Sequence, residues 1–219
     1  MSLLPYIEVA TGEKPGASVI WLHGLGADGH DFEPIVPELK LAKEHAVRFI
    51  FPHAPKIPVT INGGMVMPAW YDILDMNINR KVDSEQLQAS ADAVIALVEQ
   101  ELARGIPSEQ IFLAGFSQGG AVAYQAALSY DKPLGGLLTM STYLATADTL
   151  ELHPQNKNTP VMVMHGTEDP VVPEQLGQAA ISFLQKHDYS HQYKTYRMPH
   201  SVCAEQITDI SKWLQPKLK

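Results

Sequence analysis

The feature that most constrains this chain is a serine between an apolar run and a run of small residues, in the stretch IFLAGFSQGGAVA at 111–123. Residues 111–114 are typical of a buried strand, whereas residues 118–128 favour a helix. The turn between them, 115–119, matches the pattern G-x-S-x-G, whose two glycines let the strand and helix backbones pass closely. The pattern predicts that the Ser117 hydroxyl stands exposed at a sheet edge, at the positive end of a helix dipole. The alternative is a structural turn that happens to contain serine.

The composition fits one globular domain spanning residues 1–219, long enough to bury a sizeable core. Acidic residues number 24 against 16 lysines and arginines, which gives a net charge of −8 without a basic run. This charge argues against a nucleic-acid partner and gives little attraction to an anionic membrane surface. Residues 1–14 lack the apolar core of a signal peptide, and no apolar segment approaches the length of a membrane span. Because Cys203 is the single cysteine, an internal disulfide is excluded, and we expect a cytoplasmic protein without stable membrane insertion.

Buried-strand patterns and helical patterns alternate along the chain, as they do in proteins with a mainly parallel sheet. The clearest helix begins at Asp83, with Gln86 three residues later, and is stopped by Gly105. Expected strands lie at 6–10, 17–22, 47–51, 111–114, 135–140, 161–165 and 192–198, and further helices at 32–43, 118–128, 173–187 and 203–218. This order predicts an α/β fold whose central sheet is covered by helices on both faces, with residues 6–10 as a short edge strand.

Residues 52–82 form the longest stretch without a helical pattern. The tripeptide Asn-Gly-Gly at 62–64 lies between two short β-prone runs at 59–61 and 65–67, which indicates a hairpin. A long ordered excursion from a compact sheet is more often functional than idle. Within it, we interpret Asp72 as a structural anchor of the loop.

A serine hydroxyl becomes a nucleophile only when a base takes its proton and a third group holds that base. In this architecture the acid and the histidine follow the serine on loops after later strands, because reactive groups gather at the carboxyl ends of parallel strands. The strand predicted at 161–165 is followed by Asp169, which suits the acid role, with neighbouring Glu168 as a rival. The strand predicted at 192–198 is followed by His200, which suits the role of the base.

Acyl transfer also requires backbone amides aimed at the developing oxyanion. One is expected from Gln118, the residue after the serine, and the other from the glycine-rich loop His-Gly-Leu-Gly at 23–26. The glycines on either side of Leu25 let its amide point into the site, and His23 is expected to shape the loop.

The remaining histidines show no pattern that we interpret as metal ligation. His53 and His165 lie at strand ends, and the others lie in polar surroundings typical of solvated side chains: His30, His45, His153, His187 and His191. The sequence shows no H-E-x-x-H or C-x-x-C motif and no spacing of histidine and carboxylate that we interpret as a ligand set, so we expect neither a metal nor a cofactor.

Six segments of the chain are similar, in order, to the phospholipase/carboxylesterase family of α/β-hydrolases, which includes carboxylesterases and acyl-protein thioesterases. They are LHGLGADGHDF at 22–32, FPHAP at 51–55, PVTINGGMVMPAWYDI at 58–73, GFSQGGA at 115–121, HGTEDPVVP at 165–173 and PHSV at 199–202. The resemblance covers nearly the whole chain and is to the small bacterial carboxylesterase branch in particular. It implies the α/β-hydrolase fold without a large lid domain, a catalytic triad of Ser117, Asp169 and His200, and an oxyanion hole formed by the amides of Leu25 and Gln118.

The resemblance also implies that the hairpin at Asn62, together with Trp70, borders an apolar acyl-binding groove. We therefore expect Leu25, Trp70 and Met65 to bind substrate, although aromatic residues and methionines are often simple packing. Tyr71 stands where many members of the family have phenylalanine, which would make that wall of the groove slightly more polar.

These residues predict a serine hydrolase that cleaves carboxylic esters, or thioesters, of small to medium acyl chains through an acyl-enzyme intermediate. Acyl-protein thioesterase and lysophospholipase are alternatives for the natural activity, because an acyl-protein, a lysophospholipid and a simple ester present the same acyl carbonyl. An acyltransferase using the same triad and a binding protein without turnover are further alternatives, although a binding protein has no need of a strained serine turn. The expected partner is a small-molecule acyl ester or thioester; the oligomeric state stays open, with a homodimer as one option.

Overall fold

A seven-stranded sheet in the order β1-β3-β2-β8-β9-β10-β11 forms the core of the molecule. The computed structural model describes residues 3–75 and 80–219; residues 1–2 and 76–79, which belong to the expected N-terminal segment and to the stretch at 52–82, lie outside that description. Strand β1 pairs antiparallel with β3 at one edge, and the other neighbours pair parallel. The strands are β1 Tyr6–Ala10, β2 Ala17–Leu22, β3 Val47–Pro52, β8 Ile111–Phe116, β9 Gly136–Met140, β10 Val161–Gly166 and β11 His191–Tyr196. The expected mainly parallel sheet with an edge strand at 6–10 is therefore confirmed.

Helices cover both faces of this sheet, because its strands carry apolar side chains on both sides. Along β2, Ile20 and Leu22 belong to one hydrophobic cluster, whereas Val19 and Trp21 belong to another. The first cluster includes residues of α2 (Ser84–Ala103), α3 (Gln118–Ser129) and α4 (Glu174–Lys186), and the second includes residues of α1 (Ile35–Glu38) and α5 (Ala204–Leu214). Short 3₁₀ helices lie at Gly29–Asp31, Thr60–Asn62, Ser108–Gln110, Pro154–Asn156 and Gln215–Lys217.

The prediction of a helix at 32–43 is wrong in length, because α1 covers only four of these residues. Pro34 and Pro37 lack an amide N–H, and a proline inside a helix removes a backbone hydrogen bond. Lys40 then takes a left-handed conformation, with φ of 47°, through which a right-handed helix does not continue. The two prolines and the left-handed residue therefore leave a single helical turn.

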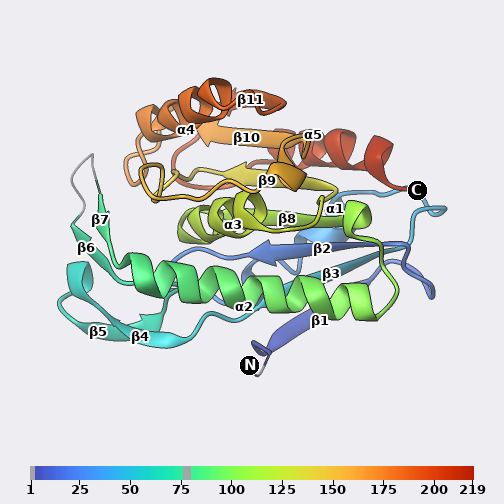
Figure 1. Cartoon of the computed structure of the whole chain (residues 1–219), viewed down its shortest axis with the longest axis horizontal. Helices are drawn as coiled ribbons and strands as arrows, with labels where there is room; N and C mark the ends of the chain where they lie inside the picture. Colours follow the sequence, from blue (N-terminus) through green and yellow to red (C-terminus); the bar gives the residue numbers. More distant parts are fainter. Residues whose placement is uncertain (1–2, 76–79) are drawn as a thin grey trace.

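The excursion between β3 and α2 forms two small antiparallel pairs beyond the carboxyl ends of the parallel strands, at the left in Figure 1. Strands β4 (Lys56–Val59) and β5 (Met65–Pro68) form the expected hairpin. Strand β6 (Ile73–Asp75) pairs with β7 (Lys81–Val82), directly before α2. The excursion therefore stands next to the end of the sheet at which the serine loop lies.

The turn of the hairpin is longer than the Asn-Gly pattern suggested, because residues 60–62 form a 3₁₀ turn. Gly63 and Gly64 follow with φ of 67° and 77°, conformations that residues with a Cβ rarely adopt. The Asp72 carboxylate accepts hydrogen bonds from the amide and the hydroxyl of Thr60, at 2.7 and 2.5 Å. Asp72 thus anchors the turn, as expected.

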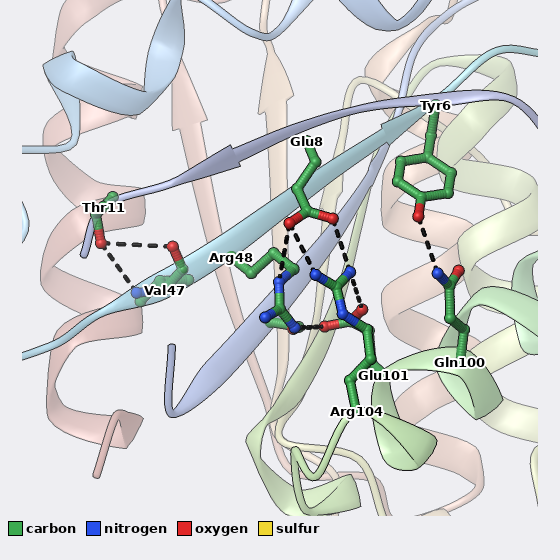
Figure 2. A network of polar contacts seen from close by, with 9 residues as sticks. Tyr6, Glu8, Thr11, Val47, Arg48, Gln100, Glu101 and Arg104 are labelled. Carbon is green, nitrogen blue, oxygen red and sulfur yellow. Dashed lines mark hydrogen bonds and ion pairs between the residues drawn. The ribbon is translucent and has the colours of Figure 1, made fainter. Parts of the chain in front are cut away.

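An ion-pair network ties the opposite end of the sheet to α2, as Figure 2 shows. Glu101 of α2 is fully buried and accepts hydrogen bonds from Arg48 at 2.6 Å, from Arg104 at 3.1 Å and from the Ser18 hydroxyl. Arg104 also donates to both carboxylate oxygens of Glu8 on β1, at 2.7 and 2.9 Å. A buried carboxylate is costly unless it is paired, so this network depends on all its members.

Candidate active site

Ser117 occupies the sharp turn between β8 and α3. Its backbone has φ of 54° and ψ of −123°, a conformation that is strained for a residue with a side chain. Its amide donates to the Met140 carbonyl at 2.9 Å, and its carbonyl accepts from the Thr142 hydroxyl at 2.5 Å. The end of β9 and the loop after it therefore hold the turn. A Cβ on Gly119 would lie 2.5 Å from the His23 carbonyl oxygen, and one on Gly115 would lie 2.5 Å from the Gly119 carbonyl oxygen. Both glycines of the motif are therefore needed for the backbones to approach.

The structure brings Ser117, His200 and Asp169 together from three separate loops. The distance from the Ser117 Oγ to the His200 Nε2 is 2.9 Å, and that from the His200 Nδ1 to an Asp169 carboxylate oxygen is 2.6 Å. A carboxylate only accepts, so Nδ1 carries the proton and Nε2 is free to accept from the serine hydroxyl. This is the hydrogen-bond order that nucleophilic catalysis by serine requires.

Asp169 is held by its own loop as well as by the histidine. Its second carboxylate oxygen accepts from the amides of Val171 and Val172, at 2.9 and 2.8 Å. Burial by itself would raise the pKa of the Asp169 carboxyl, but the hydrogen bonds from His200 and from these amides outweigh it, and the pKa lies below its ordinary value. The rival Glu168 instead pairs with Arg197 at 2.8 Å, on an exposed part of the surface.

The loop of Asp169 is braced by a second histidine. His165 is fully buried at the end of β10, and its Nε2 donates to the Val172 carbonyl at 2.8 Å. Burial lowers the pKa of His165, which keeps the imidazole neutral. The strand-end position was visible in the sequence, but the contact with the loop was not.

The loop at 23–26 lies beside the serine. Gly24, Leu25 and Gln118 line one cavity together with Ser117 and His200. The Gln118 side chain accepts from the Trp70 amide at 2.8 Å and donates to the Tyr71 carbonyl at 2.6 Å, which joins the start of α3 to the excursion. Of the two glycines around Leu25, only Gly26 has a positive φ, 80°. Its amide donates to the Pro68 carbonyl at 2.8 Å, so the hairpin supports the loop.

The cavity has a volume of about 270 Å³ and mostly apolar walls. Besides the five residues just named, the cavity is lined by Ala27, Asp31, Ile61, Ile73, Arg80, Phe116, Tyr143 and Val171. Arg80 lies over the Tyr143 ring, 4.9 Å from its centre, and both residues also border a neighbouring cavity of about 520 Å³. Tyr143 comes just after β9, and residues at the carboxyl ends of parallel strands are expected near the site. Arg80 lies in the excursion, and no motif or spacing in the sequence pointed to it.

Two of the three expected substrate-binding residues do not line this cavity, whereas Leu25 does. Trp70 is 1% exposed, and its indole N–H donates to the His23 carbonyl at 2.8 Å. Met65 is 63% exposed on the hairpin. Tyr71 is also fully buried, and its hydroxyl shares a 2.8 Å hydrogen bond with that of Tyr143. The part of the hairpin that reaches the cavity is Ile61, which the sequence analysis did not single out.

Three residues that the sequence analysis did not connect meet near this loop. Each of Asp28, His30 and His53 offers a ligand atom, and these atoms lie within 4.8 Å of one another. However, the His53 Nδ1 accepts from the Gly29 amide at 3.1 Å, which places the proton of a neutral imidazole on Nε2. Neither nitrogen of His53 then presents a free lone pair, so the donor set as it stands does not fit a metal ion.

A mostly parallel sheet with a serine at a strand–helix turn, an acid after β10 and a histidine after β11 defines an α/β-hydrolase. A family model described as Phospholipase/Carboxylesterase matches residues 5–218. Acyl-protein thioesterase 1 of Gibberella zeae is 38% identical over 213 residues, covering 92% of this chain and 91% of its own. Carboxylesterase SOBER1 of Arabidopsis thaliana is 34% identical, covering 92% of this chain and 90% of its own.

Solved structures agree with these sequence matches. The crystal structure of Arabidopsis thaliana SOBER1 has a TM-score of 0.86 at 32% identity, covering 93% of this chain and 99% of that chain. That of Zea mays acyl-protein thioesterase 2 has a TM-score of 0.87 at 27% identity, covering 98% of this chain and 99% of that chain. The chain therefore belongs to the phospholipase/carboxylesterase family, and it is an esterase with the α/β-hydrolase fold. Its attribution to the bacterial branch stays a prediction.

Proposed function

We propose that this esterase cleaves small to medium acyl esters and thioesters through a covalent acyl-enzyme on Ser117. The observation that carries the proposal is the continuous line of hydrogen bonds from the Ser117 hydroxyl through His200 to Asp169, at 2.9 and 2.6 Å. The serine at the N-terminus of α3 also lies where the helix dipole favours negative charge.

In the first half of the reaction, the Ser117 oxygen attacks the acyl carbonyl while the His200 Nε2 takes the hydroxyl proton. The carbonyl oxygen becomes an oxyanion, which the amides of Leu25 and Gln118 stabilise. The intermediate then expels the alcohol or thiol, which receives the proton from His200. In the second half, water gives a proton to His200 and attacks the acyl-enzyme. The resulting intermediate expels the Ser117 oxygen, which takes the proton back from His200, and the carboxylic acid is released. Asp169 stays ionised and stabilises the imidazolium.

The size and chemistry of the cavity support small to medium acyl chains. Its volume of about 270 Å³ lies just below the range of roughly 300–1,000 Å³ typical of sites for drug-sized ligands. Its walls at Leu25, Ile61 and Ile73 are aliphatic, which suits the burial of an acyl chain. Rates with p-nitrophenyl esters from acetate to palmitate would test this range, and a rate that rises steadily to palmitate would contradict it.

Acyl-protein thioesterase activity is the second candidate, because relatives that cover most of this chain carry that name. A palmitoyl-thioester peptide and lysophosphatidylcholine, each measured beside a p-nitrophenyl ester, would separate the three possible activities. A kcat/KM for the thioester above that for the simple ester would favour an acyl-protein as the natural substrate.

The role of Ser117 is tested by Ser117→Ala, which removes only the hydroxyl. We expect loss of nearly all turnover and of labelling by a fluorophosphonate probe, without a change in Tm. Ser182→Ala is the matched control, since Ser182 is exposed on α4, and it should label and turn over as the wild type does. A Ser117→Ala variant that retained a tenth of the activity would exclude Ser117 as the nucleophile. A wild type that did not label would favour a binding protein, and product that depended on an added alcohol would favour an acyltransferase.

The organisation and location of the enzyme complete the proposal. Two hydrophobic clusters on the faces of one sheet support the expectation of a single domain over residues 1–219. Within the described residues, none of the helices combines the length and apolar character needed to cross a bilayer. A cytoplasmic location, a small-molecule ester or thioester as the partner, and a homodimer as one option for assembly are proposals that follow from the sequence.

A further inference from the structure

His23 is a buried histidine that the proposed reaction does not use. It follows β2 directly, is 1% exposed, and precedes the Gly24–Gly26 loop beside Ser117. Both of its ring nitrogens have a partner: the Ala54 amide lies 3.1 Å from Nε2, and the Gly24 carbonyl oxygen lies 2.8 Å from Nδ1. These two contacts determine the state of the ring.

The Ala54 amide can only donate, so the His23 Nε2 must be the unprotonated nitrogen. The proton of the neutral imidazole is then on Nδ1, which donates to the Gly24 carbonyl. A doubly protonated ring would direct an N–H at the N–H of Ala54. Burial lowers the pKa of His23, against the raising effects of the hydrogen bond with Gly24 and of Asp28 and Asp31, and nearby His53 lowers it further. Burial therefore favours the neutral ring, and the two contacts determine which of its nitrogens carries the proton.

The Gly24 carbonyl and the Leu25 amide belong to the same peptide unit. That unit is planar and trans, so its C=O and its N–H point in opposite directions. Because the His23 Nδ1 holds the Gly24 oxygen on its own side, the Leu25 N–H must point away from the ring. A rotation of this peptide that turned the amide would break the hydrogen bond with His23.

The backbone of His23 is also tied to the second proposed oxyanion donor. Its carbonyl accepts from the Trp70 indole at 2.8 Å, and the Trp70 backbone amide donates to the Gln118 side chain at 2.8 Å. The His23 and Trp70 rings lie 5.0 Å apart between their centres. Trp70, buried and outside the cavity, thus connects the loop at 23–26 to the start of α3.

We propose that His23 is a positioning residue of the oxyanion hole, whose neutral, Nδ1-protonated imidazole holds the Gly24–Leu25 peptide so that the Leu25 amide faces the oxyanion. The inference rests on the proposed function, since it requires that Ser117 generate an oxyanion. His23 touches neither substrate nor the reacting atoms; it acts through the peptide that it holds.

Two substitutions separate the two ring contacts. In His23→Asn the side-chain amide nitrogen stands near the position of Nδ1 and can still donate to the Gly24 carbonyl. In His23→Gln the side-chain oxygen reaches toward the position of Nε2 and can accept from the Ala54 amide, but the donor to Gly24 is lost. His23→Leu loses both contacts.

We expect His23→Asn to keep most of the wild-type kcat, whereas His23→Gln and His23→Leu lose about 10²- to 10³-fold in kcat with little change in KM, as when an oxyanion donor is removed. The affinity for a trifluoromethyl ketone, which forms a tetrahedral adduct with serine, should fall in parallel with kcat. A role in packing alone predicts instead that His23→Asn and His23→Gln lower kcat equally, and that result would overturn the inference.

A measurement on the unmodified protein covers the case in which the variants do not fold. The ¹⁵N shifts of the His23 imidazole should report the neutral Nδ1-protonated tautomer throughout the pH range of activity, and an Nε2-protonated or charged ring would overturn the inference. Ser117→Ala, measured beside these, keeps the two proposals apart. If Ser117→Ala stays active, the proposed function fails. If Ser117→Ala is inactive while His23→Asn and His23→Gln have the same kcat, only the role of His23 fails.

Discussion

Asp169 is the residue of the site whose environment is most completely specified. It accepts hydrogen bonds from the His200 imidazole and from two backbone amides of its own loop, and its side chain is fully buried. These partners hold a carboxylate that orients His200 with Nδ1 protonated. In a neutral amide of the same shape, the oxygen can still accept from the two loop amides, but the NH₂ group then faces His200 and favours its opposite tautomer.

Asp169→Asn should therefore lower kcat by about 10⁴-fold, the loss known for this substitution in serine proteases, while the fold is retained. Glu168→Gln is the matched control: Glu168 pairs with Arg197 on the exposed surface, and its loss should change kcat little. Steady-state kinetics of both purified variants on one short-chain ester would decide between them. A larger loss for Glu168→Gln would move the acid role to Glu168.

Among the elements, α2 depends on a buried carboxylate as well as on its apolar face. Glu101 connects it to Arg48 on β3 and to Ser18 on β2, and Arg104 connects it to Glu8 on β1 (Figure 2). Removing Arg48 leaves the buried Glu101 carboxylate with only Arg104 and the Ser18 hydroxyl as partners, whereas an exposed ion pair contributes little.

Arg48→Met should accordingly lower the free energy of unfolding by more than about 1 kcal/mol and by at most about 5 kcal/mol, because Arg104 still offsets part of the Glu101 charge. Lys132→Met, which breaks the half-exposed pair with Glu99, should change it by at most about 1 kcal/mol. Urea denaturation followed by circular dichroism would measure both values. Equal effects of the two substitutions would show that the network around Glu101 contributes no more than a surface pair. Because the network lies at the far end of the sheet from Ser117, kcat of the folded Arg48→Met protein should stay close to that of the wild type.

For the molecule as a whole, several shifted pKa values act on stability in the same direction. The carboxyl pKa values of five acidic residues are lowered: Glu8, Asp28, Glu99, Asp169 and Asp209. For Glu8 the main cause is the hydrogen bond from Arg104. Burial lowers the pKa of the neutral histidines His23 and His165. In each case the unfolded chain binds the proton more readily than the folded protein does, so stability falls as the pH falls.

We expect Tm to decline in two stages as the solution is acidified. The first stage begins below the ordinary histidine value of 6.5, as His23 and His165 become charged in the unfolded chain only. The second and steeper stage begins near the ordinary carboxyl values of 4.5 for Glu and 3.8 for Asp. Calorimetry between pH 8 and pH 2 would record both stages. A Tm that stays constant from pH 6.5 to pH 5 would contradict the burial of two neutral histidines.

Local patterns in the sequence predicted the elements that build the sheet, because each pattern expresses a property of a few consecutive residues. Strand β2 and the edge strand β1 have the bounds expected from their apolar runs, and α2 begins where Asp83 accepts from the Gln86 amide. Ser117 and His200 could be singled out because the carboxyl ends of parallel strands meet at one edge of a sheet, and the same rule left Asp169 and its neighbour Glu168 as candidates for the acid. Where the expectation failed, as for the helix at 32–43, two prolines and the left-handed Lys40 left a single helical turn.

Side-chain direction and burial were decided only by tertiary packing, since they depend on residues distant in the sequence. Trp70 was expected to border the acyl groove, yet it does not line the cavity, and its indole N–H donates to the His23 carbonyl, 47 positions earlier. Arg80 lines the cavity because the excursion stands beyond the strand ends (Figure 1), where its guanidinium lies over the Tyr143 ring. The tautomer of His23 follows from an amide 31 positions away, at Ala54. A hydrogen bond between distant residues leaves no periodic trace in the chain, because either partner is compatible with many local patterns and only the fold makes them neighbours.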